Sequence, residues 1–118
     1  MQTFECIAQN IEKFLGEVLT IESKKQVLTG RASGETLAET AQRLNVTFER
    51  VRQIEAKIAR RFALSKEGQH IISALANIDT AEELKSHCGE YYSQTVYLLR
   101  LYKESFFYNN EPLDKFAL

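Results

Sequence analysis

Residues 34–57 read GETLAETAQRLNVTFERVRQIEAK. Asn45 divides this stretch into two amphipathic segments, and asparagine readily takes the left-handed backbone conformation of a tight turn. Thr36 and Glu39 have the spacing of a capping box, and Thr47 is a good N-cap, so a helix is expected to begin after each threonine. The pattern therefore predicts two helices joined by a tight turn, the arrangement of a helix-turn-helix.

The second of these helices is expected to run to about Ser65. Its apolar residues recur every three or four positions and so share one buried face; they are Val51, Ile54, Ile58 and Phe62. The preceding segment offers apolar partners for that face, namely Leu37, Ala41, Leu44 and Val46. Ala41 is small, which would let the two helix backbones approach closely where they cross.

The charge of the chain is unevenly distributed. The window from Arg43 to Lys66 holds seven Lys or Arg and two acids, a net charge of +5, whereas the whole chain carries −1. The remainder is therefore at −6. A basic block on an otherwise acidic protein indicates one surface that faces a polyanion, although a solvated helix face would give the same count.

The polar residues at the start of the basic helix suit the edges of base pairs. A glutamate such as Glu49 can accept from the amino group of cytosine, Arg52 can pair with guanine in bidentate fashion, and Gln53 suits adenine. Four cations of this helix are better placed for phosphates; they are Arg50, Lys57, Arg60 and Arg61. Thr36 and Thr47 stand at helix N-termini, where backbone N–H groups can also bind phosphate.

The flanks of the chain also have helical patterns, so the predicted fold is all-α, and we expect three segments: 1–20, 21–66 and 67–118. An amphipathic helix is expected over Thr3–Val18 and a second helix over Glu22–Leu28, with a loop from Thr29 to Gly34 because glycines and hydroxyl residues break the pattern there. The C-terminal extension should hold a helix over Gly68–Asn77, with inward residues Ile71, Ile72, Leu75 and Ile78. A short helix capped by Asp79 or Thr80, the latter in capping-box spacing with Glu83, should end at Cys88 and Gly89. A long aromatic helix over Tyr91–Tyr108, stopped by Pro112, should follow.

From Val27 to Phe62 the sequence resembles the fourth conserved region of the bacterial sigma-70 family, which reads the −35 element of promoters. The residues that carry the resemblance are 34–39 and, more specifically, 46–57. The resemblance implies that Glu49, Arg52 and Gln53 meet bases and that Arg50 meets the DNA backbone. It also implies docking on the flap of the RNA polymerase β subunit through an apolar surface.

Three departures from the family pattern matter. Phe48 stands where the family usually has an arginine that contacts the promoter, so either a thymine methyl is met there or the DNA site differs. Thr40 stands where the family usually has an apolar core residue, and its hydroxyl is expected to bond back to the Thr36 carbonyl. The chain has no counterpart of the region that melts the −10 element, so we do not expect a complete primary sigma factor.

The sequence favours a sequence-specific double-stranded DNA-binding protein, acting as a transcription regulator or sigma-like accessory. The alternatives are an adapter that binds RNA polymerase and a DNA-targeting module of a larger protein. A homodimer is favoured over a monomer, because one short helix reads few base pairs. Enzymatic activity, a cofactor and a metal are not expected, since His70 and His87 are isolated and a phosphate-binding glycine loop is missing.

The expected cellular compartment rests on two sequence features that are not found, a membrane-spanning segment and a secretory signal. No apolar run approaches the roughly 20 residues that span a bilayer, and the start of the chain does not have the pattern of a secretory signal. A cytoplasmic protein is therefore expected. Cys6 and Cys88 lie far apart in the sequence, and a disulfide between them is not expected.

Overall fold

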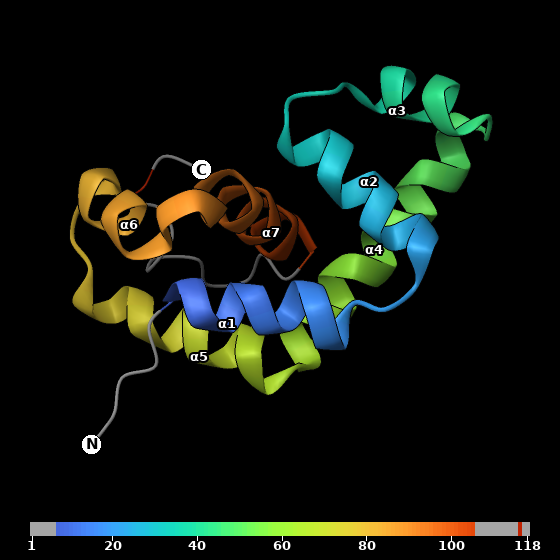
Figure 1. The fold of residues 1–118 in the computed structure, drawn as a ribbon. Helices are drawn as coiled ribbons and strands as arrows, with labels where there is room; N and C mark the ends of the chain where they lie inside the picture. The colour runs from blue at the N-terminus through green and yellow to red at the C-terminus, as the bar shows by residue number, and fades with distance from the viewer. Residues whose placement is uncertain (1–6, 106–115, 117–118) are drawn as a thin grey trace.

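The computed structural model describes residues 7–105 and 116, and these form helices and connecting turns without a strand (Figure 1). The α-helices are α1 (Ile7–Lys13), α2 (Glu22–Ala32), α3 (Leu37–Leu44), α4 (Phe48–Leu64), α5 (Lys66–Ala74), α6 (Ala81–Cys88) and α7 (Tyr92–Ser105). A π-helical turn, η1 (Phe14–Val18), continues α1, and two 3₁₀ turns, η2 (Leu75–Asn77) and η3 (Gly89–Tyr91), follow α5 and α6. The predicted all-α class is confirmed.

The first helix changes its winding partway along. A single helix was expected over Thr3–Val18; its first residues, with Phe4 and Cys6, lie outside the described residues. From Phe14 the helix is π-helical, and the Leu19 N–H donates to the Phe14 carbonyl at 2.8 Å. Phe14, the first residue of this π-helical turn, is fully buried in the core.

The second helix is longer than expected. Gly30, which was expected to lie in a loop, is part of this helix. The predicted loop from Thr29 to Gly34 is wrong in its first four residues: α2 continues to Ala32. Gly30 is buried, and the side chains of Glu35 and Arg43 occupy the space that a Cβ at this position would need. The glycine therefore serves close approach, and the chain turns at Gly34, whose φ is +109°.

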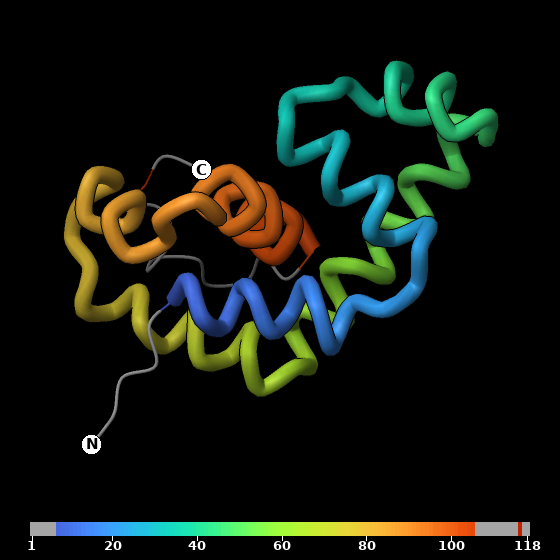
Figure 2. The backbone as a smooth tube through the Cα atoms, viewed as in Figure 1, coloured from blue at the N-terminus to red at the C-terminus, as the bar shows by residue number. Residues whose placement is uncertain are grey.

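The fourth helix, α4, packs against several of the other helices. Its predicted apolar face is confirmed, with Val51, Ile54, Ile58 and Phe62 at 4% exposure or less. Helices α2, α3, α5 and α7 all contact α4, and the tube of Figure 2 shows α2 crossing it. In Figure 1, α3 and the first turns of α4 project to one side, away from α1, α5, α6 and α7.

The C-terminal extension packs against both α1 and α4. Its first helix begins earlier than the predicted Gly68 because the Ser65 hydroxyl caps it, accepting from the Gly68 N–H at 2.9 Å. Ile71, Leu75 and Ile78 are buried as predicted, whereas Ile72 is only partly covered.

The cap of α6 differs from the expected capping box. The Thr80 hydroxyl accepts from the Glu83 N–H at 3.1 Å, but the Glu83 carboxylate accepts from the N–H of Asp79 rather than from that of Thr80. Helix α6 ends at Cys88 and Gly89 as predicted, with Gly89 at a φ of 58°.

The last described helix is α7, which covers most of the aromatic helix predicted over Tyr91–Tyr108. Tyr91 itself closes η3, and the helix is described to Ser105. The predicted end near Tyr108 and the stop at Pro112 lie outside the described residues.

One apolar core joins the N-terminal flank, the central segment and the C-terminal extension. Its buried residues extend from Ile7 on α1, through Ile58 on α4, to Leu98 on α7. The division into segments 1–20, 21–66 and 67–118 stays a prediction. Within the part of the chain that the structure describes, we find no helix with the length and apolar character that crossing a bilayer requires.

Candidate nucleic-acid interface

Local hydrogen bonds build the turn between α3 and α4. The capping box predicted at Thr36 is present: its hydroxyl accepts from the Glu39 N–H at 3.1 Å, and the Glu39 carboxylate accepts from the Thr36 N–H at 2.8 Å. Asn45 takes the left-handed conformation, with φ 56° and ψ 49°. The Thr47 hydroxyl then caps α4 by accepting from the Arg50 N–H at 3.0 Å. The predicted helix-turn-helix geometry is thus encoded by neighbouring residues.

The packing of α3 on α4 is confirmed in part. Ala41 is 7% exposed and lies at the contact, as a small residue at a helix crossing should. Leu37 and Leu44 are only partly buried. Val46, expected among the packing residues, is 38% exposed, because it follows the left-handed turn residue and faces outward before α4 begins.

The hydroxyl of Thr40 has a partner that the sequence analysis did not identify. Instead of bonding to the Thr36 carbonyl, it donates to Glu35 Oε1 at 2.8 Å. Arg43 Nε lies 2.7 Å from the other oxygen of Glu35, and a second nitrogen of Arg43 donates to the Gln26 carbonyl at 3.0 Å. The Arg43 hydrogen bond, with help from Thr40, holds the pKa of Glu35 below its usual range. Arg43, counted in the basic block, is therefore used to fasten α3 to α2.

The candidate base-reading residues lie together on the projecting end of α4. The side chains of Phe48, Glu49, Arg52 and Gln53 are all exposed. Phe48 is the first residue of α4 and is 49% exposed, a large aromatic surface to leave in water. Glu49 and Arg52 are one turn apart and form a loose ion pair with 3.8 Å between Oε1 and Nε. Such an exposed pair contributes little to stability, so either side chain can exchange it for another partner.

The candidate phosphate-contacting residues are exposed as well. Lys57 and Arg60 follow Gln53 along α4, and Arg50 and Arg61 add two further exposed cations. Thr36 and Thr47 are also exposed, and both hydroxyls already serve as helix caps. Of the two acids in the basic window, Glu49 lies on this surface and Glu55 does not. The exposed side chains of α4 are therefore five cations and one acid, a net charge of +4, whereas all the residues of α4 together carry +3.

Glu55, beside the candidate interface, has buried contacts that the sequence did not predict. This residue of α4 is 9% exposed, and its Oε2 accepts from Arg31 Nε on α2 at 2.8 Å and from the Tyr97 hydroxyl on α7 at 2.7 Å. Burial, and then the charge of Glu55, raise the pKa of Tyr97, so the hydroxyl keeps its proton and remains a donor. The sequence position of Glu55 could have indicated its burial, because Glu55 is four residues after Val51 and one after Ile54. It therefore lies at the edge of the apolar face of the helix.

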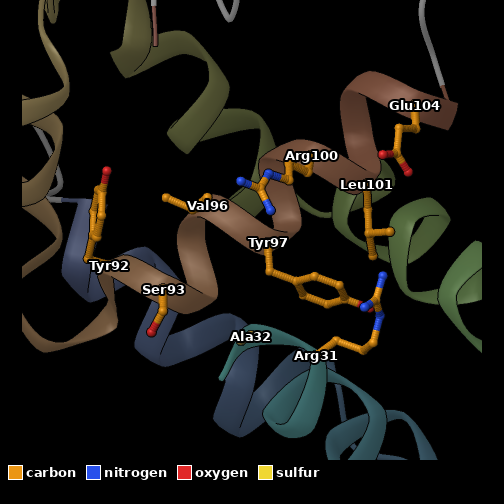
Figure 3. Close-up of a pocket in the computed structure, with 9 residues that line it drawn as sticks. All are labelled: Arg31, Ala32, Tyr92, Ser93, Val96, Tyr97, Arg100, Leu101 and Glu104. Atoms are coloured by element: carbon orange, nitrogen blue, oxygen red, sulfur yellow. The ribbon is translucent and has the colours of Figure 1, made fainter. Parts of the chain in front are cut away.

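Two open clefts adjoin this buried cluster. One, with a volume of about 340 Å³, is lined mainly by residues of α7, and Figure 3 shows the ring of Tyr97 pointing from α7 toward the Arg31 guanidinium on α2. The second is lined by Arg52, Glu55 and Leu101 among others. Within residues 7–105 and 116, no group of His, Cys, Asp and Glu has the arrangement of a metal site.

Comparison with known proteins gives one family for the central segment. Residues 22–62, about a third of the chain, match the family model described as sigma-70, region 4. No curated protein and no solved structure matches the chain. The matched residues include α2, α3 and nearly all of α4, so the helix-turn-helix of this chain is similar to that of sigma-70 region 4, as the sequence resemblance implied, and this similarity suggests a DNA-binding role connected with transcription.

Proposed function

We propose, from the sigma-70 region 4 identity of residues 22–62, that this protein binds double-stranded DNA in a sequence-specific manner as a transcription regulator or sigma-like accessory. The observation that carries the proposal is the division of α4 into two faces. Its apolar face is buried against the neighbouring helices, whereas its projecting first turns expose polar and aromatic side chains. This is the geometry that seats a recognition helix in the major groove.

The proposal assigns base contacts to the first two turns of α4. Arg52 donates to the O6 and N7 acceptors of guanine, Gln53 pairs with adenine, and Glu49 accepts from a cytosine amino group. The exposed ion pair between Glu49 and Arg52 places both side chains close together on this surface. Phe48 adds an apolar surface suited to a thymine methyl group.

Phosphate contacts come from the flanking residues. The side chains of Arg50, Lys57, Arg60 and Arg61 neutralise phosphates on either side of the groove, which fixes the register of the helix and supplies salt-dependent affinity. The N-termini that Thr36 and Thr47 cap present further backbone N–H groups to the phosphates. We place this activity in the cytoplasm, where the chain would meet DNA.

The decisive experiment starts by selecting a preferred site from a random duplex library. On that site, Arg52→Ala should cost roughly 1–3 kcal/mol of binding free energy and relax the preference at one base pair. Arg60→Ala is the matched comparison: it should weaken all duplexes about equally and reduce the dependence of log Kd on log salt by about one. If Arg52→Ala binds the selected site as tightly as the unmodified protein does, the assigned reading face is wrong.

A second function is favoured by apolar side chains outside the reading face. Leu64 is 73% exposed and Ile21 is 53% exposed, which suits a contact with another protein such as the β-subunit flap of RNA polymerase. An adapter of this kind should bind core polymerase with little loss between low and moderate salt, and Leu64→Ser should weaken that binding. Groove binding should instead weaken steeply over the same salt range.

A homodimer belongs to the proposal because a single recognition helix covers few base pairs. Dimeric readers of this type bind two half-sites about one helical turn apart, so a selected site with two-fold symmetry is expected. Light scattering that gives the mass of one protomer over a wide concentration range, together with an asymmetric selected site, would contradict the dimer.

A further inference from the structure

Glu55 occupies a position on the recognition helix where a free carboxylate would interfere with DNA. It lies three residues after Arg52, and residues three apart on a helix are surface neighbours about 5–6 Å apart between Cβ atoms. Arg52 and Glu55 also line the same open cleft, so the carboxylate has space on the Arg52 side of the helix. The structure nevertheless holds the buried Glu55 carboxylate in hydrogen bonds to Arg31 and Tyr97 rather than against Arg52.

We propose that Tyr97 is a positioning residue for DNA recognition: by donating its hydroxyl to Glu55, it keeps that carboxylate away from Arg52 and from the phosphates. This role rests on the proposed function of α4. It gives the C-terminal extension a part in DNA reading, because Tyr97 lies on α7 and outside residues 22–62.

The contact has the properties that such a role requires. The Tyr97 hydroxyl is 2.7 Å from Glu55 Oε2, and a hydrogen bond to a carboxylate is stronger than one between neutral groups. Tyr97 is 7% exposed, so water competes poorly for the same oxygen. Arg31 is more exposed, with 26% of its side chain accessible, and it also donates to the Glu35 carbonyl. Arg31 alone would therefore hold Glu55 less firmly than the pair of donors does.

Loss of the Tyr97 hydroxyl should weaken DNA binding by α4. With one donor removed, Glu55 would spend part of its time toward Arg52, where it would compete with guanine for the guanidinium and repel nearby phosphates. One unit charge a few ångström away in water changes binding by about fivefold. The change should be larger on the selected site than on random duplex, because competition for Arg52 removes a base contact as well.

The test is a mutant cycle on the full chain, measured by duplex binding. Tyr97→Phe should weaken binding to the selected site by about fivefold and relax the preference at the base pair read by Arg52. In a Glu55→Gln background the same change should have almost no effect on binding, since the amide carries no charge to release. Tyr92→Phe, which removes a hydroxyl from a partly buried tyrosine of α7 outside the Glu55 cluster, should leave affinity and base preference unchanged.

The outcomes separate the two proposals. If Tyr97→Phe lowers only the melting temperature, and the folded protein retains the affinity and base preference of the original, Tyr97 is merely structural and the inference is overturned. The same holds if Tyr97→Phe is equally harmful with Gln at position 55. If the unmodified protein selects no duplex at all, the proposed function itself fails. If Arg52→Ala has no effect on a protein that does select a site, the assigned reading face is wrong, and the role of Tyr97 falls with it.

Discussion

The ring of Phe14 meets the ring of Phe62 edge-on, with centroids 5.5 Å apart and planes at 90°. Phe62 also faces Tyr102 on α7, with centroids 6.3 Å apart and planes at 74°. Phe14 belongs to η1 and lies outside the segment that matches sigma-70 region 4, as does Tyr102. The last turns of α4 are therefore enclosed by the two flanks of the chain.

Replacement of Phe14 should destabilise the whole molecule. Phe14→Ala removes a fully buried ring and its edge-to-face contact, so the free energy of unfolding should fall by about 3–5 kcal/mol in urea denaturation. Leu15→Ala, at the neighbouring and only partly buried position, should cost clearly less. Equal losses for the two variants would mean that the η1 turn does not anchor the core as described.

Two glycines should respond in opposite ways to alanine. A Cβ at Gly68 would collide with the backbone carbonyl of Phe62, where α4 passes into α5, and backbone atoms cannot move aside cheaply. Gly68→Ala should therefore lower the free energy of unfolding by about 2 kcal/mol or more. Gly16→Ala has open space around its Cβ and should be neutral or stabilising by up to about 1 kcal/mol. Thermal and urea unfolding of both variants would check this; a harmless Gly68→Ala would contradict it.

The Glu35 cluster should make stability depend on acid. The pKa of Glu35 is lowered in the folded protein, so the unfolded chain takes up this proton more readily. The stabilisation is fully present above the unfolded-state pKa of about 4.3 and is lost as pH falls through the lower folded-state value. The difference in unfolding free energy between the original protein and Glu35→Gln should therefore shrink from pH 6 toward about pH 3.

The partner of Glu35 supplies the control for that measurement. The Arg43 hydrogen bond is the largest cause of the lowered pKa, so in an Arg43→Gln background the pH dependence of the Glu35→Gln difference should largely disappear. A difference that stays constant between the two pH values in both backgrounds would show that the Glu35–Arg43 pair has no linkage to folding.

The sequence was sufficient wherever a few neighbouring residues decide the conformation. Thr36, Asn45 and Thr47 each act within four residues of their own position, and the caps and the turn they predict are present. The apolar face of α4 was predictable because helical periodicity places its residues together. The fold class followed from the same periodicity in both flanks.

The features that were missed depend on residues distant in the chain. Gly30 looked like a loop residue because its role, admitting Glu35 and Arg43 against α2, arises only after α3 folds back. Glu55 looked like one more surface acid, since its donor Tyr97 is 42 residues away. The hydroxyl of Thr40 donates to the carboxylate of Glu35, which lies before α3, and helical periodicity does not predict this contact. The exposure of the candidate DNA-reading residues was consistent with their predicted roles, but those roles remain for binding experiments to decide.

The C-terminal end of α4 is clamped between Phe14 and Tyr102, which both contact Phe62 of this helix. The helix therefore resembles a lever that pivots at this end. Its 17 residues give a length of about 25 Å at 1.5 Å per residue. Pivoting the clamped end by about 10° would sweep the free tip through about 4 Å, more than the roughly 3.4 Å rise between stacked base pairs. If α4 reads DNA as proposed, a small rotation at these three aromatic rings would therefore move its reading residues by about one base-pair step.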